Sequence, residues 1–235
     1  ALIIETQGNT ALITMNNPSA NTWTLESLSA LNDIVAELNA DKDNYALVIT
    51  GQGEKFFSAG ADLNQFSHDD KGKAFNSSNA FGEAFEALTN YNGVSIAAIN
   101  GYAMGGGLEV ALCCDIRIAE EQAQMALPEC AVGLLPAGLG TQHLAWLIGE
   151  QWAKRMVLLG ERVNAERALA IGLISEIVEK GGAADKALEL AALVQKQSPT
   201  SVRVCKELIM SARSKPMDSA FVAEREQFVK LWDTQ

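Results

Sequence analysis

The chain has 235 residues, of which 48% are hydrophobic, and a formal net charge of -11. A chain of this length and composition can bury a full core, and we expect one large α/β domain followed by a helical appendage. The acidic balance excludes nucleic acid or an anionic membrane as the main partner, because both require a basic surface. No apolar run approaches the roughly 20 residues of a membrane-spanning helix, and no basic start followed by an apolar run predicts a signal peptide.

The four cysteines predict no disulfide framework and no metal site. They show no CxxC spacing, and three of them lie in apolar stretches. We therefore expect small buried hydrophobic side chains in a reducing compartment. The four are Cys113, Cys114, Cys130 and Cys205.

The first 50 residues predict a hairpin and then a crossover unit. Two apolar segments flank Gly8-Asn9, a pair typical of a tight β-turn. Thr24 is a suitable N-cap for a helix, because apolar residues follow it at helical spacing as far as Leu38. The apolar run at 45–50 then predicts a buried strand, and strand, helix and strand in this order favour parallel pairing through a right-handed crossover.

A polar stretch follows the segment FFSAGADL at residues 56–63. From Asn64 to Asn79 the apolar pattern is poor, so we expect a loop or lid, and its length favours a functional role. Helical spacing resumes at Phe81.

The chain from Ile99 to Ala119 has the layout of an active site. An apolar strand at 94–99 leads to the triple glycine Gly105–Gly107, and an amphipathic helix carrying Glu109 follows. Backbone amides without side chains at a helix N-terminus can hold a developing negative charge, and Glu109 would supply a base beside them. The alternative is that the glycines only permit tight packing and that Glu109 is a solvated charge.

A second acid, Glu129, follows Pro128 in a segment rich in proline and glycine. Beyond it, Gly138-Leu139-Gly140 is a weak dinucleotide-like fragment that lacks the third glycine. From Gln151 onward the pattern is mostly helical, with Asn164 as a cap and one further strand within 173–178.

Four segments, in order and with the expected separations, resemble signatures of the enoyl-CoA hydratase/isomerase (crotonase) superfamily. This resemblance implies a crotonase-like spiral of ββα units over residues 1–180, which carries the CoA-binding and catalytic site, and a C-terminal helical trimerisation region over residues 181–235. It implies acyl-CoA thioester substrates and no cofactor apart from the coenzyme A of the substrate. The segments are SAGADL at 58–63, NGYAMGGGLEVALCCDIRIA at 100–119, LPECAVGLLPAGLGTQHL at 127–144 and GERVNAERALAIGLISEIV at 160–178.

Carried over by position, the resemblance assigns four catalytic groups. The backbone N–H groups of Ala61 and Gly106 match the oxyanion hole of the family. Glu109 matches the glutamate that orients and activates water, and Glu129 matches the glutamate that exchanges the C2 proton. A thioester enolate requires two aimed donors in a dry site, and hydration requires one group for water and one for the proton.

The resemblance also implies substrate contacts by the residues Ala59, Ala61, Asp62, Leu63, Gly105 and Gly106. Some site residues have simpler readings. Asp62 is equally suited to cap the helix after it, Glu129 could be a surface charge, and His143 is expected to pack near a helix start rather than act as a base, since no serine or metal-ligand partner accompanies it.

The resulting expectation is reversible hydration of a 2-trans-enoyl-CoA to the 3-hydroxyacyl-CoA. The alternatives are an isomerase that needs only the position of Glu129, another activity of the superfamily such as decarboxylation or thioester hydrolysis, and a non-catalytic acyl-CoA-binding scaffold. A Clp-type protease of similar fold is disfavoured because no serine, histidine and acid constellation is recognisable. Exposed apolar helices after residue 183 favour a homotrimer or a hexamer, in a bacterial cytoplasm or, after removal of a leader, in a mitochondrial matrix.

Overall fold

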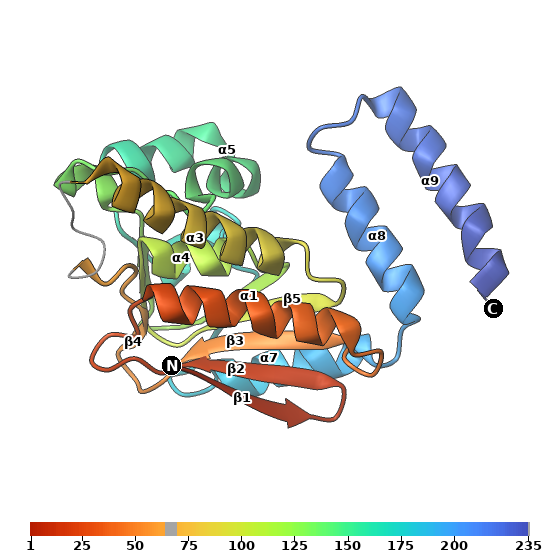
Figure 1. Cartoon of the computed structure of the whole chain (residues 1–235), viewed down its shortest axis with the longest axis horizontal. Coiled ribbons are helices and arrows are strands. Elements are labelled where there is room, and N and C mark those ends of the chain that lie inside the picture. The colour runs from red at the N-terminus through yellow and green to blue at the C-terminus, as the bar shows by residue number, and fades with distance from the viewer. Residues whose placement is uncertain (64–69, 235) are drawn as a thin grey trace.

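The computed structural model describes residues 1–63 and 70–234, which form a mixed α/β structure (Figure 1). The larger sheet has the strand order β1-β2-β3-β5-β7-β10. Its strands are β1 (Leu2–Gln7), β2 (Thr10–Met15), β3 (Ala46–Gly51), β5 (Val94–Ile99), β7 (Ile116–Glu120) and β10 (Glu176–Val178). The helices are α1 (Leu25–Ala40), α3 (Lys71–Thr89), α4 (Gly106–Leu112), α5 (Gly140–Leu158), α6 (Ala165–Ala170), α7 (Ala183–Val194), α8 (Pro199–Ser211) and α9 (Met217–Leu231).

The predicted hairpin and crossover are confirmed. Strands β1 and β2 pair antiparallel around the turn at Gly8, where φ is +60°, and β2 pairs parallel with β3 after helix α1. The side chain of Thr24 accepts a hydrogen bond from the Ser27 amide, and the Ser27 hydroxyl returns one by accepting from the Thr24 amide. This reciprocal cap satisfies two amides that a helix start otherwise leaves unpaired.

Helix α3 corrects part of the predicted loop. It begins at Lys71, after the Asp70 side chain accepts a hydrogen bond from the Gly72 amide, and it includes most of the stretch in which we expected a loop. Apolar spacing failed to indicate its first two turns because they are exposed, and the helix is anchored further on by Phe81 and Phe85, whose rings pack edge to face at 5.5 Å. Residues 64–69 of the expected lid lie outside the described part of the chain.

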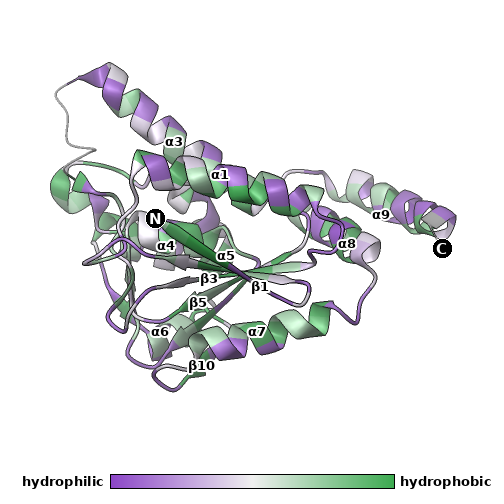
Figure 2. Cartoon of the chain, turned by 60° about the horizontal axis from the view of Figure 1, so that its bottom comes forward, coloured by the Kyte–Doolittle hydropathy of each residue, from purple (hydrophilic) through white to green (hydrophobic). Residues whose placement is uncertain are grey.

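The larger sheet is covered on both faces. Helices α1, α3, α4 and α5 lie on one side of it, and α7 lies on the other (Figures 1 and 2). The near-continuous apolar character of β3 and β5 fits this double burial. Helix α7 packs with Ala183, Ala187 and Ala191 against the sheet, so the helical region predicted to begin at residue 181 divides into α7, which belongs to the core, and an extension beyond it.

That extension is the arm formed by helices α8 and α9, which stands apart from the body in Figure 1. Helix α9 packs on α8 and has no buried residue. Its apolar side chains Phe221, Val222, Phe228 and Val229 are exposed. The arm therefore carries an apolar surface that the described chain leaves uncovered.

A smaller sheet positions the candidate site. It has the order β4-β6-β8-β9, with β4 (Phe56–Ser58), β6 (Tyr102–Met104) and β8 (Gln124–Ala126) parallel to one another and β9 (Val163–Asn164) antiparallel at the edge. Because β4, β6 and β8 run in the same direction, the segments that follow them emerge at one edge. Those segments contain Ala61, Gly106 and Glu129.

The cysteine prediction is half right. Cys113 and Cys114 are buried, but Cys130 and Cys205 are exposed. Cys130 lies in the short 3-10 helix Glu129–Val132, none of whose residues is buried, and Cys205 lies on the arm. No helix among the described residues combines the length and the apolar character that crossing a membrane requires.

Candidate active site

The triple glycine forms the turn into helix α4, as the sequence predicted. Gly105 is the N-cap and has φ +53°, a conformation that side-chain-bearing residues rarely adopt. Gly107 packs directly on β4, because a Cβ atom there would lie 2.1 Å from the carbonyl oxygen of Ser58. The glycines therefore bring the first amides of α4 against the segment that follows β4.

That segment is held by Trp23 in a parallel bridge to Ala61. The Trp23 amide donates to the Gly60 carbonyl at 2.8 Å, and the Asp62 amide donates to the Trp23 carbonyl at 2.9 Å. Since alternate residues of an extended segment turn their amides to opposite sides, the Ala61 amide points away from Trp23.

The amides of Ala61 and Gly106 lie on neighbouring segments. Gly60 has φ +93°, and a Cβ atom on it would lie 3.1 Å from the Gly106 nitrogen and 2.7 Å from the Met104 carbonyl oxygen. Only glycine permits this approach of the two backbones. The sequence reasoning assigned no role to Gly60 or Trp23, although the glycine within SAGADL was a signal of close backbone approach.

A cavity of about 410 Å³ opens beside these amides. Seven residues that the sequence analysis assigned to the site line it, namely Ala59, Ala61, Leu63, Gly105, Gly106, Glu109 and Glu129. Asp62 is not among the lining residues, and residues 64–69, where the helix that it was expected to cap would lie, are outside the described residues. The structure thus brings both glutamates and both candidate oxyanion donors to one space.

Glu109 is buried, with 3% of its surface exposed, which contradicts the reading of a solvated charge. Its Oε1 atom accepts hydrogen bonds from the amides of Gly138 and Gly140, both at 2.8 Å. Burial raises the pKa of Glu109 to about 7, although the two amide donors act in the opposite direction. A carboxylate with a pKa near neutrality is suited to general base catalysis.

The fragment Gly138-Leu139-Gly140 forms a cradle for this carboxylate. Leu139 has φ +74° and caps helix α5, and the two glycines stand so close to Glu109 that a Cβ on Gly140 would lie 2.7 Å from its Oε1 atom. From the sequence, this fragment was interpreted as a weak dinucleotide motif and as part of the family signature at 127–144, with no contact to Glu109. The signal for the contact with Glu109 was the pair of glycines at the start of a helix, where backbone amides bind anions.

Glu129 occupies a different environment. Its Oε2 atom is buried and has no hydrogen-bond partner among the described residues, and its Oε1 atom lies close to Gly105, where a Cβ would approach it to 2.8 Å. Burial raises the pKa of Glu129, so its neutral acid form is favoured relative to an exposed glutamate. When Glu129 is ionised, its charge also contributes to raising the pKa of Glu109.

The rest of the cavity is mainly apolar. Phe81, Val132, Leu134 and Leu135 contribute to its wall, and no Lys, Arg or His is among the described residues that line it. Within residues 1–63 and 70–234, no group of three or more His, Cys, Asp or Glu side chains is arranged to hold a metal ion. The arrangement can therefore bind an apolar group beside two carboxylates and two backbone donors.

Comparison with known proteins identifies related sequences across the whole chain. The family model described as "Enoyl-CoA hydratase/isomerase" matches residues 5–235. A short-chain-enoyl-CoA hydratase of Clostridium acetobutylicum is 33% identical over 100% of this chain and 90% of its own length. A 2,3-dehydroadipyl-CoA hydratase of Escherichia coli is 34% identical over 100% of this chain and 91% of its own length.

Solved structures agree with the sequence relatives. Pseudomonas aeruginosa DspI is 60% identical, with a TM-score of 0.98 over 100% of this chain and 96% of that chain. An enoyl-CoA hydratase from Bacillus anthracis is 30% identical, with a TM-score of 0.93 over 97% of this chain and 89% of that chain.

Proposed function

Because the chain belongs to the enoyl-CoA hydratase/isomerase family, we propose that it hydrates 2-trans-enoyl-CoA reversibly to 3-hydroxyacyl-CoA. The observation that carries this proposal is a pair of carboxylates on one cavity, the buried Glu109 and the half-buried Glu129 with its buried Oε2 atom, beside the backbone amides of Ala61 and Gly106. An oxyanion site alone would suit many acyl-CoA reactions, whereas addition of water uses two proton-handling groups.

In this mechanism, the thioester oxygen accepts hydrogen bonds from the amides of Ala61 and Gly106. Both donors are held by backbone geometry, through the bridge to Trp23 and the start of helix α4. Negative charge grows on that oxygen as water attacks C3 and the thioester becomes an enolate. Donors aimed at such an oxygen typically contribute ~2.7 to 4 kcal/mol each to the transition state.

The cradle assigns different roles to the two oxygens of Glu109. Its Oε1 atom is engaged by two amides, so Oε2 is the atom that accepts the proton of the attacking water. The oxygen of that water bonds to C3, and the neutral acid of Glu129 delivers its proton to C2. Ionised Glu129 and protonated Glu109 then exchange protons with solvent to restore the starting state.

The cavity wall favours an aliphatic acyl group. The described lining offers no cation to pair with a terminal carboxylate, so we propose monocarboxylic enoyl-CoA substrates rather than a substrate such as the one named for the Escherichia coli relative. Coenzyme A enters only as part of the substrate, and the proposal includes no other cofactor.

An enoyl-CoA isomerase is the second candidate. It moves a proton between carbon atoms and can use a single carboxylate, and the unpartnered Oε2 atom of Glu129 is suited to that task. The second buried glutamate favours hydration, since isomerisation gives Glu109 no proton to transfer.

We further propose that the chain forms a trimer or a hexamer through its arm. Helix α9 exposes the side chains of Phe221, Val222, Phe228 and Val229, and burial against another subunit would remove this surface from water.

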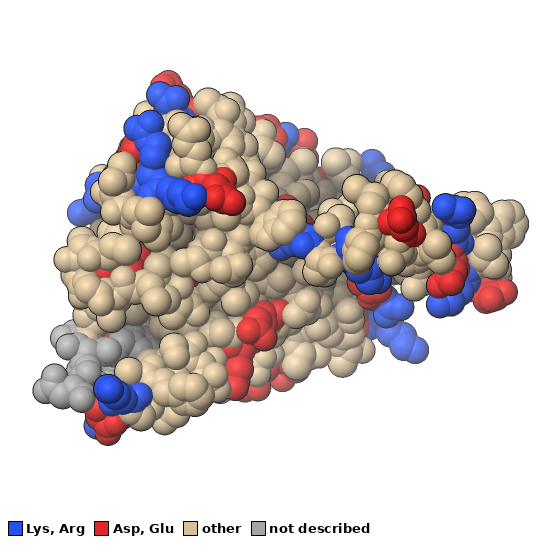
Figure 3. Space-filling view, turned by 90° about the horizontal axis from the view of Figure 1, so that it is seen from above, with Lys and Arg blue, Asp and Glu red and all other residues tan. Residues whose placement is uncertain are grey.

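On the face seen in Figure 3, basic and acidic side chains are interspersed, which supports the proposal that nucleic acid is not a partner. The location of the protein, in a bacterial cytoplasm or a mitochondrial matrix, stays a prediction.

The proposal is tested with crotonyl-CoA by following the loss of absorbance of the conjugated thioester. We expect turnover by the parent protein and severe loss in Glu109→Gln and Glu129→Gln, while both variants keep their affinity for the saturated analogue butyryl-CoA. An active Glu109→Gln protein beside an inactive Glu129→Gln protein would favour the isomerase. Full activity of both variants would refute the site.

A further inference from the structure

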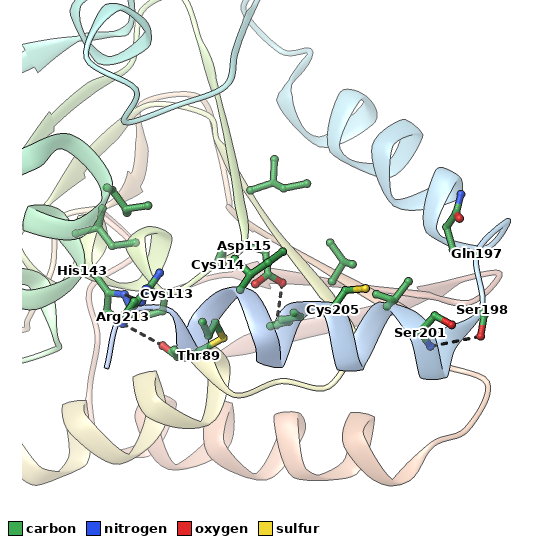
Figure 4. A pocket seen from close by; sticks show the side chains of 18 residues that line it. Thr89, Cys113, Cys114, Asp115, His143, Gln197, Ser198, Ser201, Cys205 and Arg213 are labelled. Atoms are coloured by element: carbon green, nitrogen blue, oxygen red, sulfur yellow. Dashed lines mark hydrogen bonds and ion pairs between the residues drawn. The ribbon is translucent and has the colours of Figure 1, made fainter. Parts of the chain in front are cut away.

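A second cavity, of about 600 Å³, lies between helix α8 and the core (Figure 4). Its described lining shares no residue with the candidate active site. Helix α4 connects the two spaces: its first residues border the active site, and Leu112 and Cys113 at its other end border the second cavity. The second cavity is therefore a separate space.

Apolar side chains form most of its wall. They come from the core and from α8, and include Leu112, Ile116, Leu147, Val202, Ile209 and Met210. The lining residues run along α8 from Ser201 to Met210, a length of about 14 Å at the helical rise, and continue to Arg213 in the turn after the helix. An elongated apolar group matches this shape better than a compact polar one.

The polar groups gather at the ends and along one side of this wall. Figure 4 shows His143, Arg213 and Thr89 at one end and Gln197, Ser198 and Ser201 at the other. Of the described lining residues, Asp115 is the sole carboxylate, and its Oδ2 atom accepts from Lys206 Nζ at 2.8 Å. Lys206 also donates to the carbonyl oxygens of Tyr91 and Gly93, so its three donors are used.

Arg213, in contrast, has no carboxylate partner among the described residues. One of its donors, Nη1, lies 3.1 Å from Nδ1 of His143. His143 is 8% exposed, and burial together with the charges of Arg213 and Arg117 lowers its pKa to about 4. The ring is therefore neutral at pH 7 and accepts the hydrogen bond through Nδ1 without offsetting the positive charge.

A second guanidinium strengthens the positive field at this end. Arg117 is buried behind the cavity and donates to the carbonyl oxygens of Leu173 and Cys114. No described carboxylate forms an ion pair with it. An anion beside Arg213 would thus directly meet one guanidinium that has no carboxylate partner among the described residues, and a second at longer range, in surroundings partly shielded from water.

We propose that this cavity is a second ligand site, which binds an aliphatic carboxylate with its chain between α8 and the core and its carboxylate on Arg213. Arginine presents its donors in a fork that matches the two oxygens of a carboxylate. The chain would cover the apolar wall, including Ile209, which is largely exposed in the described chain. The occupant is therefore a fatty acid in its free, ionised form.

The test measures binding of dodecanoate by calorimetry, below its critical micelle concentration and with butyryl-CoA saturating the active site. We expect one site per chain in the parent protein and affinity for 1-dodecanol weaker by about tenfold or more, since the alcohol lacks the charge. The proposal would be overturned if dodecanoate did not bind, if 1-dodecanol bound equally well, or if dodecanoate bound only when butyryl-CoA was left out. Closure of the cavity by another subunit would appear as absence of binding.

Three variants and a matched control locate the site. Arg213→Gln removes the charge, Arg213→Lys keeps it, and Cys205→Phe fills the cavity from α8. Arg203→Gln is the control: it removes an arginine charge from α8, close in the chain to Arg213 in the turn after that helix, at a residue that does not line the cavity. We expect about tenfold weaker dodecanoate binding in Arg213→Gln and Cys205→Phe, partial rescue in Arg213→Lys, and unchanged binding in Arg203→Gln.

Turnover of crotonyl-CoA checks that each variant is folded, since none of these residues lines the candidate active site. Two results would place dodecanoate elsewhere and overturn the proposal. In the first, folded Arg213→Gln and Cys205→Phe bind dodecanoate as tightly as the parent. In the second, Arg203→Gln weakens binding as much as they do.

Discussion

The carboxylate of Glu109 is hydrogen-bonded to the backbone amide of Gly140, with 2.8 Å between Oε1 and the nitrogen. Gly140 is the first residue of helix α5, so the positive end of that helix faces a buried acid. The same amide orients the side chain and favours its ionised form, while burial favours the neutral form. Because the amide and burial act in opposite directions, the pKa of Glu109 stays near neutrality.

Substitution of Gly140 tests the cradle. In Gly140→Ala the new methyl group would lie 2.7 Å from Glu109 Oε1 and would displace the carboxylate. We expect kcat with crotonyl-CoA to fall by about tenfold to a hundredfold, with a smaller change in KM, because positioning of the base is lost. Gly82→Ala is the control, since a Cβ there approaches only the far end of Glu86 at 3.9 Å. Equal activity of the two variants would contradict the role of the cradle.

The Gly106 amide can be removed at a favourable position. Gly106 is the first residue of α4, where proline is well tolerated, but its Cβ would lie 2.9 Å from the Phe81 ring. Gly106→Ala introduces the same contact and keeps the N–H group, so the pair of variants isolates the donor. We expect kcat of Gly106→Pro to be about a hundredfold or more below that of Gly106→Ala. Similar rates in the two folded variants would rule out this donor.

The raised pKa of Glu109 also predicts how stability depends on pH. Between its ordinary pKa of 4.5 and the folded value of about 7, the folded protein binds more protons than the unfolded chain. Glu109 therefore lowers the free energy of unfolding as pH rises through this window, by up to about 3 kcal/mol. We expect Glu109→Gln to be more stable than the parent at pH 8 and to lose this advantage by pH 4, as measured by urea denaturation.

The same group should set the acid limb of kcat/KM, with an apparent pKa near 7. A stability difference between Glu109→Gln and the parent that stayed constant from pH 4 to pH 8 would show that Glu109 does not titrate in this window.

Self-association is tested on helix α9. Phe221→Asp and Phe228→Asp in one protein place charges on its exposed apolar face. Ser219→Asp is the control, because it places a charge at an exposed position about 160° around the helix from Phe221. We expect light scattering to find a trimer or hexamer for the parent and for Ser219→Asp, and a smaller species for the double variant. A parent protein that stays monomeric at micromolar concentration while active would contradict the interface.

Local patterns were sufficient to predict the hairpin, the crossover around α1 and the helix behind Gly105, because turn residues, caps and apolar spacing determine such elements. The start of α3 escaped prediction, since its first turns are exposed and helical spacing needs a buried face to be visible. The site depended on resemblance for Ala61, whose side chain carries no signal. The contact between Glu109 and the Gly138–Gly140 loop escaped because it joins segments about 30 residues apart through backbone amides.

The most direct measurement of the proposed activity is the mass of the product formed from crotonyl-CoA in water enriched in oxygen-18. The proposed mechanism forms a bond between a water oxygen and C3, so it predicts 3-hydroxybutyryl-CoA that carries one oxygen-18 atom in the acyl group. Glu109→Gln should form this product at a severely reduced rate. An acyl-CoA product that contains no oxygen from water, formed at the rate of substrate loss, would contradict hydration.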